Sequence, residues 1–207
     1  MNNVTLSAGL DALKIKTTPR QLEQLEAFVQ LLLRWNKVFN LTAIKDYEEA
    51  LVLHLFDSLS VAPYLKGKRC LDVGAGGGLP GIPLAIIQPE RYFVLIDAVS
   101  KKTRFMQQAV IELGLKNVEV IHSRIEKAGL ASEYDAIISR AFASINDFVS
   151  LSGQYLQQGG TIYAMKGRYP ESELKELSTA FYVNAETPLS IPYKNIERVL
   201  IEIKQHD

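Results

Sequence analysis

The feature that most limits the possible folds is a glycine-rich segment, LDVGAGGGLPGIPLAII, between residues 71 and 87. An apolar run that ends at Val73 precedes the glycines, and an apolar run that suits a helix follows them. This order is typical of the first unit of an α/β nucleotide-binding fold, because glycine allows positive φ and close approach of a ligand. A P-loop is excluded, since that motif ends in Gly-Lys-Ser/Thr and this loop continues with Pro-Gly-Ile.

Two cofactor classes remain for this loop. A dinucleotide fingerprint, GxGxxG, matches from Gly76 to Gly81, but the glycines directly after the strand are Gly74 and Gly76, and the third position is then Leu79. The pattern hydrophobic-Asp-hydrophobic-Gly-x-Gly-x-Gly, typical of S-adenosylmethionine-dependent methyltransferases, matches LDVGAGGG without a shift. We therefore predict an S-adenosylmethionine site that includes Gly74 and Gly76.

Two acidic residues accompany the loop. Asp97 ends the next predicted strand, where a carboxylate can accept hydrogen bonds from both hydroxyl groups of a ribose. Asp72 lies inside the motif and has two possible roles, which do not exclude each other. It can bind the amide groups of the loop, or it can lie near the amino group of the methionine moiety.

The rest of the chain after residue 67 alternates strands with helices, which predicts βαβ units and a mostly parallel sheet. The last two strands have no helix between them, so we expect the final one to be antiparallel. The fold class is α/β, a Rossmann-like class I methyltransferase with a seven-stranded sheet. We expect strands at residues 70–73, 92–96, 118–122, 136–139, 161–165, 181–187 and 198–204, and helices at 83–88, 101–113, 146–156 and 171–181.

Residues 1–66 are expected to form a helical extension packed on the methyltransferase domain of residues 67–207. Thr18 and Pro19 are a helix start signal, and apolar residues then recur every three or four positions up to Phe39. A second helix is expected from about residue 47 to residue 62, before Pro63.

Composition excludes several classes of protein. Lys plus Arg and Asp plus Glu both number 23, so any nucleic-acid binding must use a local patch rather than a cationic coat. The single cysteine, Cys70, allows no intrachain disulfide, and the histidines show no zinc spacing, so we expect no metal. Neither a signal peptide nor a membrane span is evident. We expect a cytoplasmic protein, monomeric and without membrane contact.

Cationic residues follow the carboxyl ends of the predicted strands. Because parallel strands all point one way, these side chains converge on the ligand edge and suit a nucleic-acid substrate; the alternative is that they are ordinary solvated charges. Arg140 closes an apolar strand, where an unpaired charge is costly, so we expect a specific partner for it. The proposed RNA-binding residues are Lys101, Lys102, Arg104, Lys166 and Arg168, with Arg124 on the same edge.

The motifs that the sequence lacks limit which kind of substrate atom can accept the methyl group. The fourth strand is followed by SRAFAS rather than the Asp/Asn-Pro-Pro-Tyr loop used for amines, and Cys70 lies at the wrong end of the sheet for pyrimidine C5 methylation. A ring nitrogen such as guanine N7 has a lone pair and no proton to lose, so we expect no catalytic general base. His54 and Asp57 share a helix face and either dock the helical extension or contact RNA.

At the level of whole motifs, the sequence resembles the RsmG family of bacterial small-subunit rRNA guanine-N7 methyltransferases, also called glucose-inhibited division protein B. The resemblance extends from end to end of the chain. The matching strings are WNKVFNLTAI, HLFDSL, LDVGAGGGLPGIPLAI, SRIE, ISRAFAS and MKG.

This resemblance implies transfer of a methyl group from S-adenosylmethionine to N7 of guanine 527 of 16S rRNA. The substrate is then either the naked rRNA or the rRNA within the 30S subunit. It also implies that Gly74, Leu79, Ile125, Glu126 and Arg140 belong to the cofactor site. A small-molecule methyltransferase and a non-catalytic RNA-binding assembly factor are the alternatives.

Overall fold

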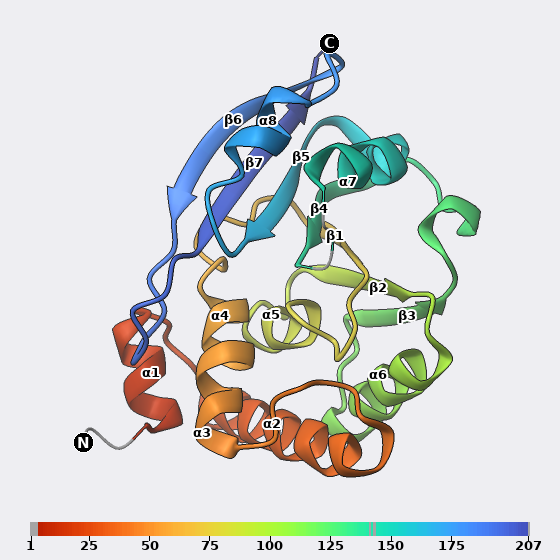
Figure 1. Ribbon diagram of the computed structural model, residues 1–207. Helices are drawn as coiled ribbons and strands as arrows, with labels where there is room; N and C mark the ends of the chain where they lie inside the picture. The colour runs from red at the N-terminus through yellow and green to blue at the C-terminus, as the bar shows by residue number, and fades with distance from the viewer. Residues whose placement is uncertain (1–3, 141, 143, 207) are drawn as a thin grey trace.

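The computed structural model describes residues 4–140, 142 and 144–206. Its centre is a seven-stranded sheet in the order β3-β2-β1-β4-β5-β7-β6 (Figure 1). The strands are β1 (Arg69–Val73), β2 (Tyr92–Asp97), β3 (Val118–His122), β4 (Tyr134–Ser139), β5 (Leu156–Lys166), β6 (Phe181–Pro188) and β7 (Val199–Gln205).

The direction of the strands confirms the predicted fold class. β1 to β5 pair in parallel, whereas β7 is antiparallel to both β5 and β6. The carboxyl ends of the five parallel strands therefore lie at one edge of the sheet. β7 begins at that edge, because its first residue, Val199, pairs with Lys166 at the end of β5.

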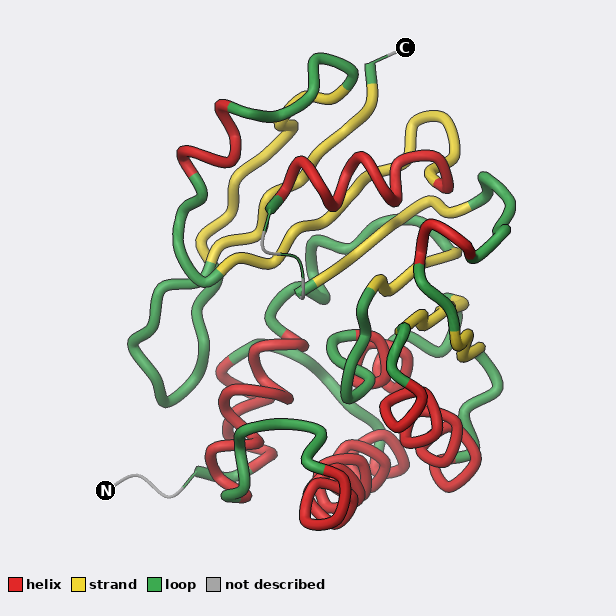
Figure 2. Tube along the Cα trace, turned by 45° about the vertical axis from the view of Figure 1, so that its right-hand side comes forward, coloured by secondary structure: helices red, strands yellow, loops and turns green. Residues whose placement is uncertain are grey.

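Helices cover both faces of the sheet, as Figures 1 and 2 show. Alternate strand residues point to opposite faces, so Leu71 and Cys70 enter two different apolar cores. One core contains residues of α5 (Gly81–Ile87) and α6 (Ser100–Leu113), and the other contains residues of α7 (Ile145–Ser152). Short elements η2 (Ile125–Lys127), η3 (Gly153–Tyr155) and α8 (Glu171–Lys175) connect the later strands.

The N-terminal helices share the core of the α5–α6 face. They begin with α1 (Leu6–Ala12) and α2 (Pro19–Phe39). The predicted start of α2 is correct, because Thr18 and Gln21 form a capping box with Pro19 at the first helical position. The helix ends at Phe39, and Asn40 caps its last turn in a left-handed conformation. The division into an extension and a catalytic domain at residue 66 stays a prediction.

Three helix predictions need correction. The helix predicted over 146–156 is α7, which ends at Ser152 and is followed by the 3₁₀ turn η3 and the start of β5. The segment predicted as one α-helix over 47–62 consists of α3 (Tyr47–Ala50), the π-helix η1 (Leu51–Phe56) and α4 (Asp57–Leu59). The wider π turn is not visible in the sequence, because most of η1 is buried and tertiary packing sets its geometry. The helix predicted over 171–181 ends at Lys175, because none of its residues is fully buried and packing therefore adds little stability.

None of the described helices has the length and apolar character needed to cross a membrane.

Candidate active site

The glycine loop after β1 has the backbone that its sequence predicts. Gly74, Gly76 and Gly78 have φ values of 72°, 59° and 74°, in the region that side chains rarely enter. The N–H of Gly74 donates to the carbonyl of Ile96, which ties the loop to β2. A side chain on Gly78 would overlap Ile82 in the first turn of α5. Small residues are therefore required by the loop's own packing as well as by access to a ligand.

Asp97 ends β2 and organises the loop. Its Oδ2 accepts the N–H of Gly76 at 2.9 Å, and its Oδ1 accepts the N–H of Val99 at 2.8 Å. Lys102 Nζ lies 4.0 Å from Oδ2. A carboxylate has about four acceptor positions, so both oxygens keep capacity for a ribose hydroxyl.

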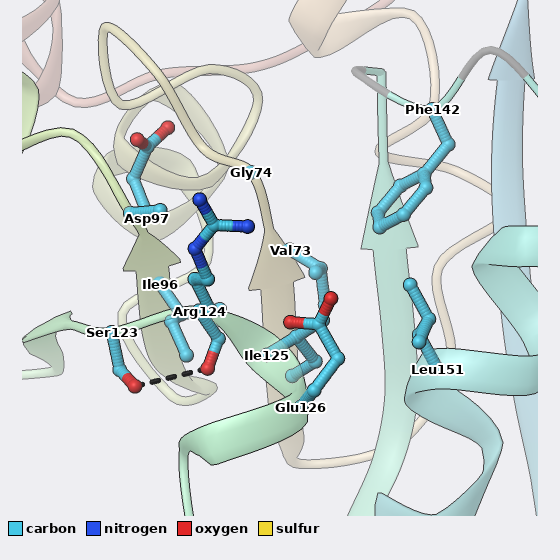
Figure 3. A pocket seen from close by; sticks show the side chains of 11 residues that line it. Val73, Gly74, Ile96, Asp97, Ser123, Arg124, Ile125, Glu126, Phe142 and Leu151 are labelled. Carbon is cyan, nitrogen blue, oxygen red and sulfur yellow. Dashed lines mark hydrogen bonds between the residues drawn. The ribbon is translucent and has the colours of Figure 1, made fainter.

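A pocket of about 240 Å³ opens at the ends of β1, β2 and β3. We call it the loop pocket; Figure 3 shows its side chains. Four of the predicted cofactor residues line it, namely Gly74, Asp97, Ile125 and Glu126. The other lining residues are Val73, Ile96, Ala98, Ser123, Arg124, Phe142 and Leu151.

Three predicted cofactor residues do not line the loop pocket. The N–H of Gly76 donates to Asp97, and Leu79 is buried. Arg140 lines a different pocket. Their roles in cofactor binding stay predictions.

Sequence reasoning missed Phe142 and Leu151, which form the wall opposite Asp97 in Figure 3. The ring of Phe142 stacks on Phe148 of α7, with centroids 5.0 Å apart. Its position in the sequence could have indicated Phe142, because this residue follows the end of β4 at the ligand edge. Together with Ile125, these residues make an apolar slot suited to a flat base.

The loop pocket and its surroundings fit S-adenosylmethionine. The apolar slot suits the adenine, and Asp97 suits the ribose. Asp72 is buried beneath the loop: its Oδ2 accepts the N–H of Gly81 at 2.8 Å, and its Oδ1 has no partner among the described residues. Burial raises the pKa of Asp72 to about 7. Asp72 therefore holds the turn, which is one of its two predicted roles, and a contact with the methionine amino group stays a prediction.

A second pocket, of about 360 Å³, lies where β4, β5 and β7 meet η1. We call it the arginine pocket. It lies beside the loop pocket, because Lys166 of its lining donates from Nζ to the carbonyl of Phe142, which lines the loop pocket, at 3.3 Å. Its lining combines apolar and cationic residues: Ile44, Leu53, His54, Asp57, Arg140, Met165, Lys166, Gly167 and Arg198.

Asp57 is the specific partner that Arg140 was expected to have. Asp57 Oδ2 accepts from Arg140 Nη1 at 2.8 Å, and Oδ1 accepts from Arg198 Nε at 2.8 Å. Sequence reasoning missed Arg198. The signal was present, because an antiparallel strand starts at the edge where parallel strands end.

His54 joins the arginine pocket to the loop after α2. Its Nε2 lies 2.7 Å from Thr42 Oγ1, which also accepts the N–H of Ile44. Burial, together with the nearby charge of Arg140, lowers the pKa of His54 to about 4. The ring is therefore neutral at pH 7 and has little affinity for a proton.

The predicted RNA-binding cations divide into two groups. Lys101 donates to the carbonyls of Phe39 and Asn40, and Lys166 donates to Glu173 and to the carbonyl of Phe142. Arg104 and Arg168 are exposed. Lys102 lies beside Asp97, and Lys166 lines the arginine pocket. An RNA contact of any of the five residues stays a prediction.

The sheet order, glycine loop and loop pocket define a Rossmann-like S-adenosylmethionine-dependent methyltransferase. Solved structures of low sequence identity share the fold. The glycopeptide N-methyltransferase MtfA, complexed with S-adenosyl-L-homocysteine, superposes with a TM-score of 0.63 at 12% identity, over 74% of this chain and 87% of that one. A SAM-dependent methyltransferase from Aquifex aeolicus gives 0.57 at 20% identity, over 75% and 92%.

The sequence model of the GidB family, rRNA small subunit methyltransferase G, matches residues 21–201. Ribosomal RNA small subunit methyltransferase G of Shigella flexneri is 45% identical over 199 residues, 96% of each chain. The protein of that name from Psychromonas ingrahamii is 43% identical over 196 residues, 95% of each chain. The chain belongs to the GidB family, as its motifs predicted.

Proposed function

We propose that this protein transfers the methyl group of S-adenosylmethionine to N7 of guanine 527 in 16S rRNA of the small ribosomal subunit. The observation that carries the proposal is the pairing of two adjacent pockets at the carboxyl edge of the sheet. The loop pocket fits the cofactor, and the arginine pocket next to it offers apolar walls and cations to a nucleotide. The name of the family, rRNA small subunit methyltransferase G, supports the choice of substrate.

The acid–base character of the arginine pocket supports a ring nitrogen as acceptor. Both carboxylate oxygens of Asp57 accept hydrogen bonds from arginines. The pKa of His54 is lowered to about 4 by burial, so its ring is a weak base. Guanine N7 needs neither group, because its lone pair attacks without losing a proton.

The cofactor supplies a methyl group already activated by its sulfonium. The protein's own contribution is then alignment and proximity. Asp97 and the apolar slot hold the cofactor's nucleoside, while the arginine pocket holds the acceptor across the end of β4. The proposed contacts with the RNA backbone remain Lys101, Lys102, Arg104, Lys166 and Arg168. We further propose that the protein acts in the cytoplasm as a monomer.

The test is transfer of radiolabelled methyl groups to RNA. The protein is incubated with labelled S-adenosylmethionine and either 30S subunits or bare 16S rRNA from a strain that lacks the modification, and the label is mapped. Label on N7 of guanine 527 is expected, and the better of the two substrates identifies the form recognised. Label on another nucleotide, or no transfer to RNA despite measurable cofactor binding, would overturn the proposal in favour of another acceptor or a non-catalytic role.

A further inference from the structure

Asp57 joins three distant parts of the chain at the arginine pocket. It stands at the junction of η1 and α4, Arg140 follows β4, and Arg198 precedes β7. Only 6% of the Asp57 side chain is exposed, against 22% for Arg140 and 27% for Arg198. A buried carboxylate thus holds two guanidinium groups that a ligand can still reach.

We propose that Asp57 is a positioning residue for RNA binding. It fixes the guanidinium of Arg198 so that the donors left over bind a phosphate of the acceptor strand. This inference deepens the proposed function and rests on it, because it assumes an RNA substrate.

The hydrogen bonds of Arg198 fix the plane of its guanidinium. Nε donates to Asp57 Oδ1 at 2.8 Å, and Nη1 donates to the carbonyl of Glu197 at 2.9 Å. A guanidinium has five N–H donors in a rigid plane, so two anchored nitrogens set the direction of the third. Nη2 makes no hydrogen bond with the described residues and keeps two donors for an anion.

The charges around the arginine pocket favour an anion. Three cations line it, Arg140, Lys166 and Arg198, and Asp57 is the one acidic residue in the described lining. Lys166 pairs with Glu173 at 2.9 Å, outside that lining. An excess of positive charge remains on the pocket wall, as phosphate recognition requires.

The backbone under Asp57 supports the same role. The π-helix η1 ends immediately before it, and the carbonyl of Leu53 in η1 lies 3.4 Å from Arg140 Nη1. π turns inside helices occur frequently at functional sites, where they change the direction of side chains and carbonyls. Asp57 and Leu53 therefore hold Arg140 from two directions.

The experiment compares Asp57→Asn, Arg198→Gln and the double variant in methylation of 30S subunits. Each single change should raise the KM for 30S subunits about 10- to 100-fold, as for one lost charge-assisted hydrogen bond, with a smaller effect on kcat. The slope of log KM against log salt should become shallower by about 1. The double variant should match the stronger single one, because both changes remove the same contact.

The matched control is Glu202→Gln, a buried carboxylate on β7 that contacts Asn184 and lies outside the described lining of the arginine pocket. It should lower thermal stability without changing the KM for 30S subunits. A folded Asp57→Asn protein with an unchanged KM and salt slope, or single effects that add in the double variant, would overturn the inference.

If Asp57→Asn does not fold, Arg198→Lys decides the question. Lysine keeps the charge but lacks the planar group that Asp57 fixes, so a raised KM supports positioning and an unchanged KM refutes it. The wild-type protein is measured first. Failure of the wild type to label guanine N7 would overturn the proposed function itself, separately from the comparison of variants.

Discussion

The N–H of Gly76 donates to Asp97 Oδ2 at 2.9 Å, which joins the glycine loop to the end of β2. One carboxylate therefore shapes the loop and also lines the loop pocket. The two functions are coupled, because a change at Asp97 alters the loop as well as the predicted ribose contact.

Asp97→Asn should weaken binding of S-adenosylmethionine about 10- to 100-fold, because an amide replaces one acceptor oxygen with a donor. The measurement is titration calorimetry with the cofactor in the absence of RNA. Glu119→Gln, an exposed carboxylate on the neighbouring strand β3, is the control and should bind normally. Equal affinities of Asp97→Asn and wild type would contradict the ribose role.

Gly78→Ala should destabilise the protein more than Gly129→Ala. Both glycines have positive φ, 74° and 62°, so alanine costs about 1–2 kcal/mol of backbone strain at either position. At Gly78 the new Cβ also overlaps buried Ile82, which adds about 1–3 kcal/mol, whereas nothing lies within 4 Å at Gly129. Denaturant unfolding measures the difference, and equal losses would argue against tight packing of the loop.

His54 should make stability depend on pH in mildly acidic solution. Its pKa is lowered from 6.5 to about 4 by burial, so between these values the unfolded chain binds a proton that the folded protein does not. The free energy of unfolding should fall as pH is lowered from 6.5 to 4, by about 3 kcal/mol at most from this residue.

The measurement is denaturant unfolding of wild type and His54→Gln across that pH range. His54→Gln should show a flatter profile, because glutamine does not titrate. His122→Gln serves as the control, since His122 is exposed on β3. Parallel profiles for wild type and His54→Gln would show that His54 does not titrate as its burial implies.

Arg140→Ala should weaken cofactor binding about 10- to 100-fold while leaving the fold intact. Arg140 follows β4 beside the end of β1, and its contacts with described residues involve only Nη1, so Nε and Nη2 keep donors for the methionine carboxylate. The test is to titrate Arg140→Ala and Arg198→Ala with S-adenosylmethionine and to compare their affinities. Arg198→Ala is the control and should bind the cofactor normally. Normal cofactor binding by Arg140→Ala would show that Arg140 does not bind the cofactor and would leave RNA binding as its role.

The sequence by itself determined the fold class, the order of elements and the cofactor. Its signals for these are local: glycines at fixed spacing after a strand, a helix cap at Thr18, and strands alternating with helices. Such patterns depend on the local geometry of the backbone, which does not require knowledge of the rest of the chain. For the same reason Asp97 could be assigned to the loop pocket before its contacts were known.

Only the tertiary structure decided how the N-terminal helices take part in the site. The ion pairs of Asp57 join residues 83 and 141 positions apart, and no local pattern encodes that distance. The π turn in η1 also depends on tertiary packing, because most of η1 is buried, whereas α8 ends early because no residue of it is fully buried. Side-chain partners across the sheet edge depend on where whole elements dock, and docking is set by the complete core.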